Sequence, residues 1–252
     1  MNKDRLKKLA RDKQFIPGIF NYCDRWCERC PQTSRCLNFV ISEDEFADSE
    51  TRDIKNEAFW KKLFKIFSLT FALLKEEAEE RGLDLDIPNI ETLEEEAERS
   101  PETTEDLKVC RLAKYYSNLV EEWFKSAENL FLAAPEMMKE DLGLEEAFEV
   151  IRWYQHFIYI KLRRALEGAF VDQESEIDEF PRDSEGSAKI ALIGIDRSIA
   201  AWGTVYPHDP LHDETILRFL AHLDLLKEEV QNTFPGARSF LRPGFDKIDL
   251  NG

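Results

Sequence analysis

Four cysteines lie within 14 residues near the start of the sequence, with the spacing C-x3-C-x2-C-x5-C. Each intervening stretch is short enough to bend around one ion or cluster, and thiolates are the ligands that soft and borderline metals prefer. We therefore expect the sulfur atoms of four residues to converge on one metal centre. These residues are Cys23, Cys27, Cys30 and Cys36.

The alternative for these residues is a structural turn that holds four reduced cysteines. Free cysteines are usually buried singly, whereas this segment is rich in charge. The N-terminus lacks the apolar core and small-residue cleavage site of a secretory signal, so we predict a cytoplasmic protein. In that reducing compartment clustered cysteines are metal ligands more often than disulfide partners. The fifth cysteine, Cys110, is expected to stay apart on the core face of a helix.

The spacing leaves open an iron–sulfur cluster and a zinc ion as the cofactor. Cys27, Cys30, Pro31 and Cys36 form a C-x2-C-P-x4-C pattern, which resembles the iron–sulfur staple of RecB-type nucleases. The first three cysteines resemble the cluster motif of radical S-adenosylmethionine enzymes. Both resemblances cover only the motif, and the sequence offers no strands for the catalytic centres of those families. They imply an iron–sulfur cluster and neither activity.

The charge of the chain restricts its partners. The formal net charge is −17, from 51 acidic and 34 basic residues, so the protein as a whole repels nucleic acid and anionic membranes. Residues 1–36 differ, because they hold nine basic and four acidic side chains. Nucleic-acid contact is therefore expected only through this segment. Arg25, Arg29 and Arg35 stand among the cysteines, where they could stabilise thiolates, attract an anionic partner or neutralise the site.

Helical periodicity dominates the rest of the chain, and no run alternates with the period of a strand. We predict an all-α fold, an antiparallel bundle of four to five long helices with a small N-terminal four-cysteine metal-binding module. The expected domains are 1–42 and 54–252, joined by an acidic connection at 42–53. The expected helices cover 1–13, 56–81, 104–134, 144–169, 187–205 and 212–234, with polar loops at 84–106 and 172–185. No stretch is apolar enough to predict a membrane span.

Polar residues inside apolar helices are the other candidates for chemistry, because they are costly to bury without partners. Glu149, His156, Asp196 and His222, joined by Glu121, could line a pocket in the bundle as weak candidates for catalysis. The competing interpretation is a set of structural pairs, with Asp196 held by an arginine or a histidine. His208, His212 and Asp213 form a second possible group, although Pro210 interrupts it. Gly194 and Gly203 are expected to permit close helix approach.

These observations leave three functions open. The first is an accessory metalloprotein whose acidic bundle binds a protein partner. The second is a metal-dependent or redox enzyme with a polar pocket in the bundle. The third and weakest is nucleic-acid contact by the basic N-terminal segment.

Overall fold

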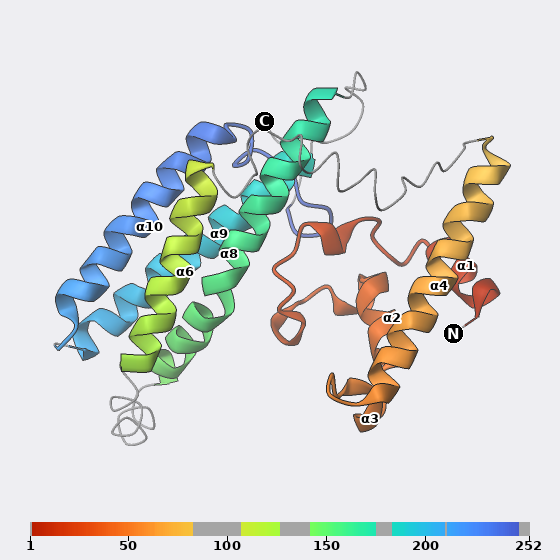
Figure 1. The fold of residues 1–252 in the computed structure, drawn as a ribbon, viewed down its shortest axis with the longest axis horizontal. Coiled ribbons are helices and arrows are strands. Elements are labelled where there is room, and N and C mark those ends of the chain that lie inside the picture. The colour runs from red at the N-terminus through yellow and green to blue at the C-terminus, as the bar shows by residue number, and fades with distance from the viewer. Residues whose placement is uncertain (1, 83–106, 127–141, 175–182, 210, 247–252) are drawn as a thin grey trace, which may run out of the picture. The chain divides into compact units, whose positions relative to one another are not determined.

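The structure is a computed structural model that describes residues 2–82, 107–126, 142–174, 183–209 and 211–246. Every regular element in these ranges is a helix, as predicted, and they contain no strand (Figure 1). The chain forms two compact units. One comprises Met1–Pro101 with Pro243–Gly252, and the other comprises Glu102–Arg242. The long helix predicted after residue 55 therefore groups with the cysteine segment, as does the C-terminal tail.

The N-terminal unit contains short helices and one long one. They are α1 (Lys3–Ala10), three 3₁₀ turns at Ile19–Asn21, Cys27–Arg29 and Thr33–Arg35, α2 (Leu37–Glu45), α3 (Ser49–Arg52) and α4 (Glu57–Glu80). Side chains cap the helix starts: the Asn56 side chain accepts from the Ala58 amide at 2.9 Å. Gly82, with φ of +67°, follows the end of α4, a position where a left-handed glycine commonly ends a helix.

The predicted acidic connection at 42–53 was wrong, because α2 continues to Glu45 and α3 fills much of the remainder. The Asp48 side chain caps α3 by accepting from the Thr51 amide at 3.0 Å. Aspartate at such a position starts a helix as readily as it occupies a loop. Composition alone did not separate the two.

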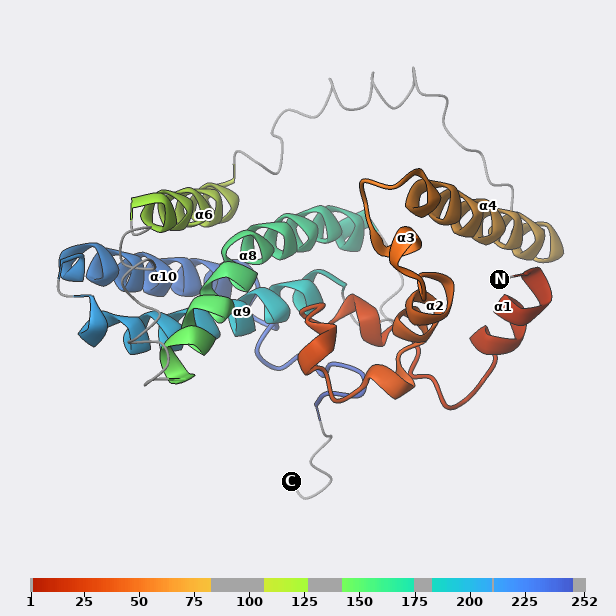
Figure 2. The ribbon, with the colours of Figure 1, turned by 90° about the horizontal axis from the view of Figure 1, so that it is seen from below.

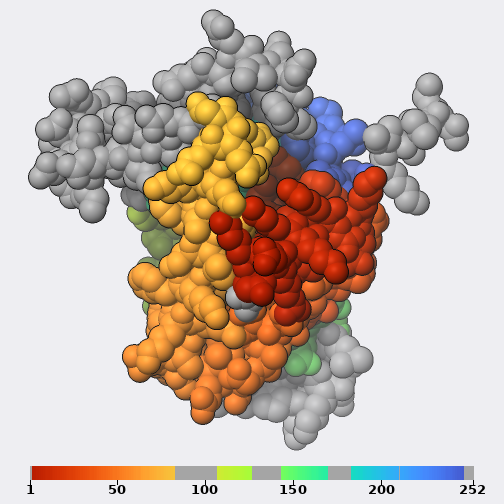
Figure 3. Space-filling view, turned by 90° about the vertical axis from the view of Figure 1, so that its right-hand side faces the viewer, coloured from red at the N-terminus to blue at the C-terminus, as the bar shows by residue number. Residues whose placement is uncertain are grey.

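The described part of the N-terminal unit has several ion pairs between its helices but few buried apolar side chains. Lys3 and Lys7 of α1 both pair with Glu76 of α4, and Arg5 reaches Asp44 at 3.0 Å. Figures 2 and 3 show α1 near α4 in this unit. Among its described residues the buried apolar side chains are Phe15, Ile19 and Ala78. This apolar core is very small for a unit of this length.

The second unit contains four long helices with a large core. They are α6 (Lys108–Ser126), α8 (Leu142–Glu174), α9 (Asp183–Val205) and α10 (Asp213–Thr233). Contacts run from α6 to α8, from α8 to α9, from α9 to α10 and from α10 back to α6, which closes a ring. Its largest fully buried side chains include Trp202, Tyr116, Tyr154, Phe219, Ile151, Ile158, Leu162, Ile190 and Leu192.

The ends of these helices correct two expectations. The polar loop predicted at 172–185 was wrong at both of its ends, because α8 reaches Glu174 and α9 starts at Asp183, and residues 175–182 lie outside the described ranges. Arg164 of α8 holds Asp183 with bonds of 3.0–3.2 Å, and acidic residues in a first turn favour the helix dipole. The helix predicted over 104–134 is described from Lys108 to Ser126. Its remaining predicted parts, and the loop at 84–106, lie outside the described residues.

Gly194 and Gly203 of α9 have opposite surroundings. A Cβ atom added at Gly194 would lie 2.9 Å from the Tyr154 ring of α8, so this glycine permits close helix approach as predicted. The same expectation for Gly203 was wrong, because nothing would lie within 4 Å of a Cβ atom there. A single helical sequence does not show which of its faces meets a neighbour.

A buried hydrogen bond between aromatic residues fixes the centre of the second unit. The Trp202 indole N–H donates to the Tyr116 hydroxyl at 2.9 Å, and both side chains are fully buried. Burial raises the pKa of Tyr116 to about 12, so the hydroxyl stays neutral. We expect Tyr116→Phe to lower the free energy of unfolding of this unit by about 2 kcal/mol, because an indole N–H is left buried and unpaired. Urea denaturation followed by tryptophan fluorescence measures the change. An unchanged midpoint would contradict the prediction.

Candidate metal centre

Tight turns present the four N-terminal cysteines. Cys27 opens the turn Cys27–Arg29, Cys30 ends it, and Cys36 both ends the turn Thr33–Arg35 and precedes α2. Between the first two cysteines, Arg25 has φ of +60°, the only positive value at a non-glycine residue in the described chain. This left-handed residue reverses the backbone so that the cysteine loop can close.

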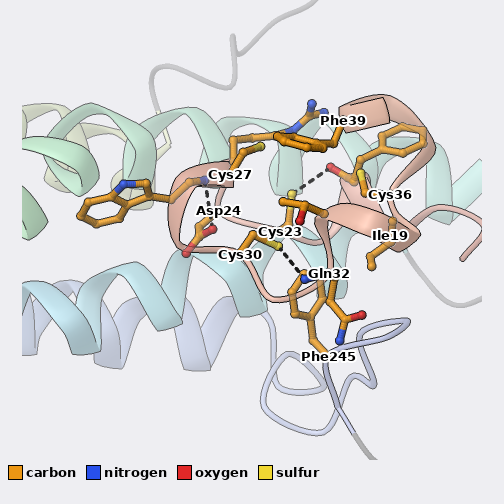
Figure 4. Close-up of a pocket in the computed structure, with 13 residues that line it drawn as sticks. Ile19, Cys23, Asp24, Cys27, Cys30, Gln32, Cys36, Phe39 and Phe245 are labelled. Atoms are coloured by element: carbon orange, nitrogen blue, oxygen red, sulfur yellow. Dashed lines mark hydrogen bonds between the residues drawn. The ribbon is translucent and has the colours of Figure 1, made fainter. Parts of the chain in front are cut away.

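The four cysteines line one hollow of about 310 Å³, a volume that includes the part open to solvent. Figure 4 shows them around this space, each on a different part of the loop. Its other lining residues are largely apolar or aromatic, and they include Ile19, Phe20, Trp26, Phe39 and Phe245. The C-terminal tail closes one side, since the Gln32 side chain donates to the Gly244 carbonyl at 2.8 Å. Sequence reasoning missed this contribution of the tail.

Two hydrogen bonds reach sulfur atoms in the hollow (Figure 4). The Gln32 backbone N–H donates to Cys30 Sγ at 3.4 Å, and the Cys23 thiol donates to the Phe20 carbonyl at 3.5 Å. A backbone N–H directed at sulfur stabilises a thiolate and tunes a metal–sulfur centre. The surroundings of Cys30 therefore suit a deprotonated thiolate that acts as a metal ligand.

The thiols influence one another electrostatically. Burial raises the pKa of the Cys27 thiol, and the neighbouring Cys23, Cys30 and Cys36 raise it further. Such mutual repulsion is expected of thiolates without a cation, and a bound metal reverses it. Of the interleaved arginines, Arg29 lies over the Trp26 ring at 4.1 Å, so its charge flanks the hollow.

The residue types in the hollow suit a metal, but their side chains are not arranged around one. In the ranges that the structure describes, no group of three or more His, Cys, Asp or Glu side chains is arranged so that it could hold a metal ion. The cysteines thus share a hollow, but the predicted convergence of their sulfur atoms on one point is not seen. Each thiol can move between staggered rotamers, and four thiolates are a complete ligand set for zinc or a cluster. As expected, Cys110 stays apart, fully buried in α6.

The catalytic candidates in the second unit are not gathered into one site. Glu149 and His156 are exposed, and His156 contacts the Ser117 hydroxyl at 2.6 Å and the Gln155 amide at 2.9 Å. His222 bonds to the Leu112 carbonyl at 2.8 Å. Glu121 pairs with Lys125 along α6. These contacts agree with the structural interpretation of the candidates.

Asp196 is held by two cations, one of them an arginine as predicted. Arg238 lies 2.7 Å and Lys227 lies 2.9 Å from its carboxylate oxygens. Burial acts to raise the pKa of this carboxyl, but the hydrogen bonds from both cations outweigh it and hold the pKa below its ordinary value. The ion pairs therefore stabilise the unit at neutral pH, and this stability is lost as the pH falls through the lowered pKa.

We expect Asp196→Asn to lower the free energy of unfolding by about 1 kcal/mol at pH 7, a small value because solvent screens the pair. The difference from the unchanged protein should disappear in acid, below the lowered pKa of the carboxyl. Denaturation curves at a series of pH values measure both effects. A difference that persists in strong acid would contradict the ion-pair explanation.

The second group of candidates, His208, His212 and Asp213, lies beside a residue that the sequence analysis did not single out. Asp209 is fully buried and accepts from His212 Nδ1 at 2.9 Å, whereas Asp213 is exposed at the start of α10. The only sequence signal for Asp209 is its place before a proline, which favours a turn. The pair anchors the connection between α9 and α10. Among the described residues it does not form part of a metal-binding group.

Comparison with known proteins gives no relative from which a function could be transferred. No family model matches the chain, and neither a curated protein nor a solved structure is significantly similar to it. Separately, none of the described helices combines the length and the apolar character needed to cross a membrane.

Proposed function

We propose that this protein binds one metal centre through Cys23, Cys27, Cys30 and Cys36, and that the centre orders its N-terminal unit. The observation that carries the proposal is the common hollow, lined by all four cysteines and by aromatic side chains. This hollow brings four soft thiol ligands around one space, as a common metal centre requires. The role proposed is that of an accessory metalloprotein.

The small core of the N-terminal unit supports a stabilising role for the metal. Its described part buries few apolar side chains, and its ion pairs are largely exposed, so each contributes little stability. Units with too little core commonly need a metal or a disulfide. Binding of a structural metal to thiolates supplies that free energy directly. The four-helix unit has its own large core and needs no such support.

The cysteine motif favours an iron–sulfur cluster over a single zinc ion, because the C-x2-C-P-x4-C pattern of Cys27, Cys30, Pro31 and Cys36 resembles an iron–sulfur staple. The amide directed at Cys30 Sγ also fits a cluster, whose properties depend on hydrogen bonds to sulfur. Zinc is the alternative metal for the same four cysteine ligands.

The proposal can be tested with metal-free protein titrated with Co²⁺, whose thiolate complexes absorb in the near ultraviolet. Cys→Ser variants at positions 23, 27, 30 and 36 are compared with Cys110→Ser, the matched control. We expect the charge-transfer absorption in the unchanged protein and in the control, and a weaker and shifted band in each of the four variants. Absence of the band, or a spectrum that only two of the four cysteines affect, would disprove a four-thiolate centre.

A further inference from the structure

One face of α4 exposes five large apolar side chains in a regular row. Their exposed fractions are Trp60 48%, Phe64 72%, Phe67 62%, Phe71 51% and Leu74 58%. Figure 3 shows α4, in orange and yellow, at the surface of the N-terminal unit. We name these five side chains the α4 stripe. Such a row at the surface is a candidate for a contact with another polypeptide.

The spacing of the α4 stripe identifies the geometry of that contact. Successive members are four, three, four and three residues apart. This is the a/d repeat with which one helix packs lengthwise on another through knobs and holes. The opposite face of α4, which includes Phe59 and Lys62, faces its own unit: Phe59 packs on Phe46 and Lys62 pairs with buried Glu45. The exposed face is therefore available for a second helix.

We propose that the α4 stripe is a dimer interface, in which α4 packs antiparallel against α4 of a second copy of this chain. The area is sufficient. A large apolar side chain presents about 150–250 Å² when free, so the partly exposed stripe leaves roughly 500 Å² on each copy. Two copies together bury about 1,000 Å², which reaches the lower limit of specific interfaces. A two-fold axis lets the same stripe serve both copies.

Charges at the two ends of the stripe select the antiparallel direction. Continuing the repeat by one step towards the N-terminus reaches Glu57 at the start of α4, and continuing it by two steps towards the C-terminus, past buried Ala78, reaches Arg81 just after the helix end. Both side chains are exposed, at 79% and 67%. In the antiparallel register that places Phe67 opposite the second copy's Phe71, each Glu57 faces an Arg81. A parallel pair would instead place like charges together at both ends.

Sedimentation equilibrium of the full-length protein tests the dimer. We expect a mass of twice 29.5 kDa, and a shift to 29.5 kDa in Phe67→Lys and in Phe64→Ser with unchanged circular dichroism. Ile160→Lys is the matched control, because Ile160 is a single apolar residue exposed to a similar extent on α8. A monomer at all concentrations, or a dimer that withstands both stripe variants, would overturn the proposal.

Charge reversal tests the direction. Glu57→Arg and Arg81→Glu should each weaken dimerisation by about tenfold, and the double variant should restore it. If the charges acted through the helix dipole instead, both changes would oppose the dipole. The double variant would then dimerise more weakly than either single variant. Restoration supports the antiparallel pair. Further weakening in the double variant, or no effect of either single change, would overturn it.

Discussion

Removal of the metal centre should unfold the N-terminal unit and leave the four-helix unit folded. The reason is the unequal distribution of buried apolar side chains, nearly all of which lie in α6, α8, α9 and α10 among the described residues. Without a metal, the four cysteines line a hollow in a unit with almost no core. The N-terminal unit then loses its main source of stability.

Circular dichroism measures the extent of this unfolding. The helices of the N-terminal unit have 8, 9, 4 and 24 residues, against 19, 33, 23 and 21 in the other unit. Chelation or Cys30→Ser should therefore remove at most about a third of the helical signal, and the rest should melt cooperatively at an unchanged temperature. Cys110→Ser, with its metal ligands intact, is the control. Loss of most of the helical signal on chelation would show that the metal supports the whole fold.

The second large effect is expected at Gly194 of α9, where an added Cβ atom would lie 2.9 Å from the Tyr154 ring of α8. Gly194→Val should destabilise the four-helix unit by about 3 kcal/mol, because the buried Tyr154 and Ile158 side chains would have to move. Thermal unfolding measures the change. Gly203→Val, in the same helix, is the matched control, because open space surrounds that position.

The control variant should be neutral or slightly stabilising, since valine has a better helix propensity than glycine. The contrast separates helix packing from helix propensity within one helix. Equal effects at the two positions would show that α8 and α9 pack more loosely than the contact at Gly194 indicates.

Local chemistry made most of the helices predictable. Helical periodicity identified the helices predicted at 104–134, 144–169 and 212–234, whose buried faces, with Val120, Ile158 and Leu223, form much of the core of the four-helix unit. Residues that start helices were harder to recognise, because Asp48 and Asp183 have the composition of a loop. The sequence therefore predicted the class of fold correctly and several boundaries incorrectly.

The surroundings of each helix could not be predicted, because they depend on contacts that are distant in sequence. Periodicity located α4 correctly, but it did not show that Phe64 and Phe67 would be exposed. The cysteine spacing indicated a shared site, whereas the contributions of Gly244 and Phe245 come from the other end of the chain. Buried Asp209 gave no periodic signal at all.

Metal and acid-labile sulfide analysis of full-length protein purified without oxygen tests the central claim most directly. We predict one metal centre per chain, containing iron with an equal amount of sulfide, and accompanied by visible absorption. Cys110→Ser should retain this centre and Cys30→Ser should lose it. Protein that contains only trace metal, or Cys30→Ser protein with an undiminished metal content, would contradict the claim that the four N-terminal cysteines bind a metal.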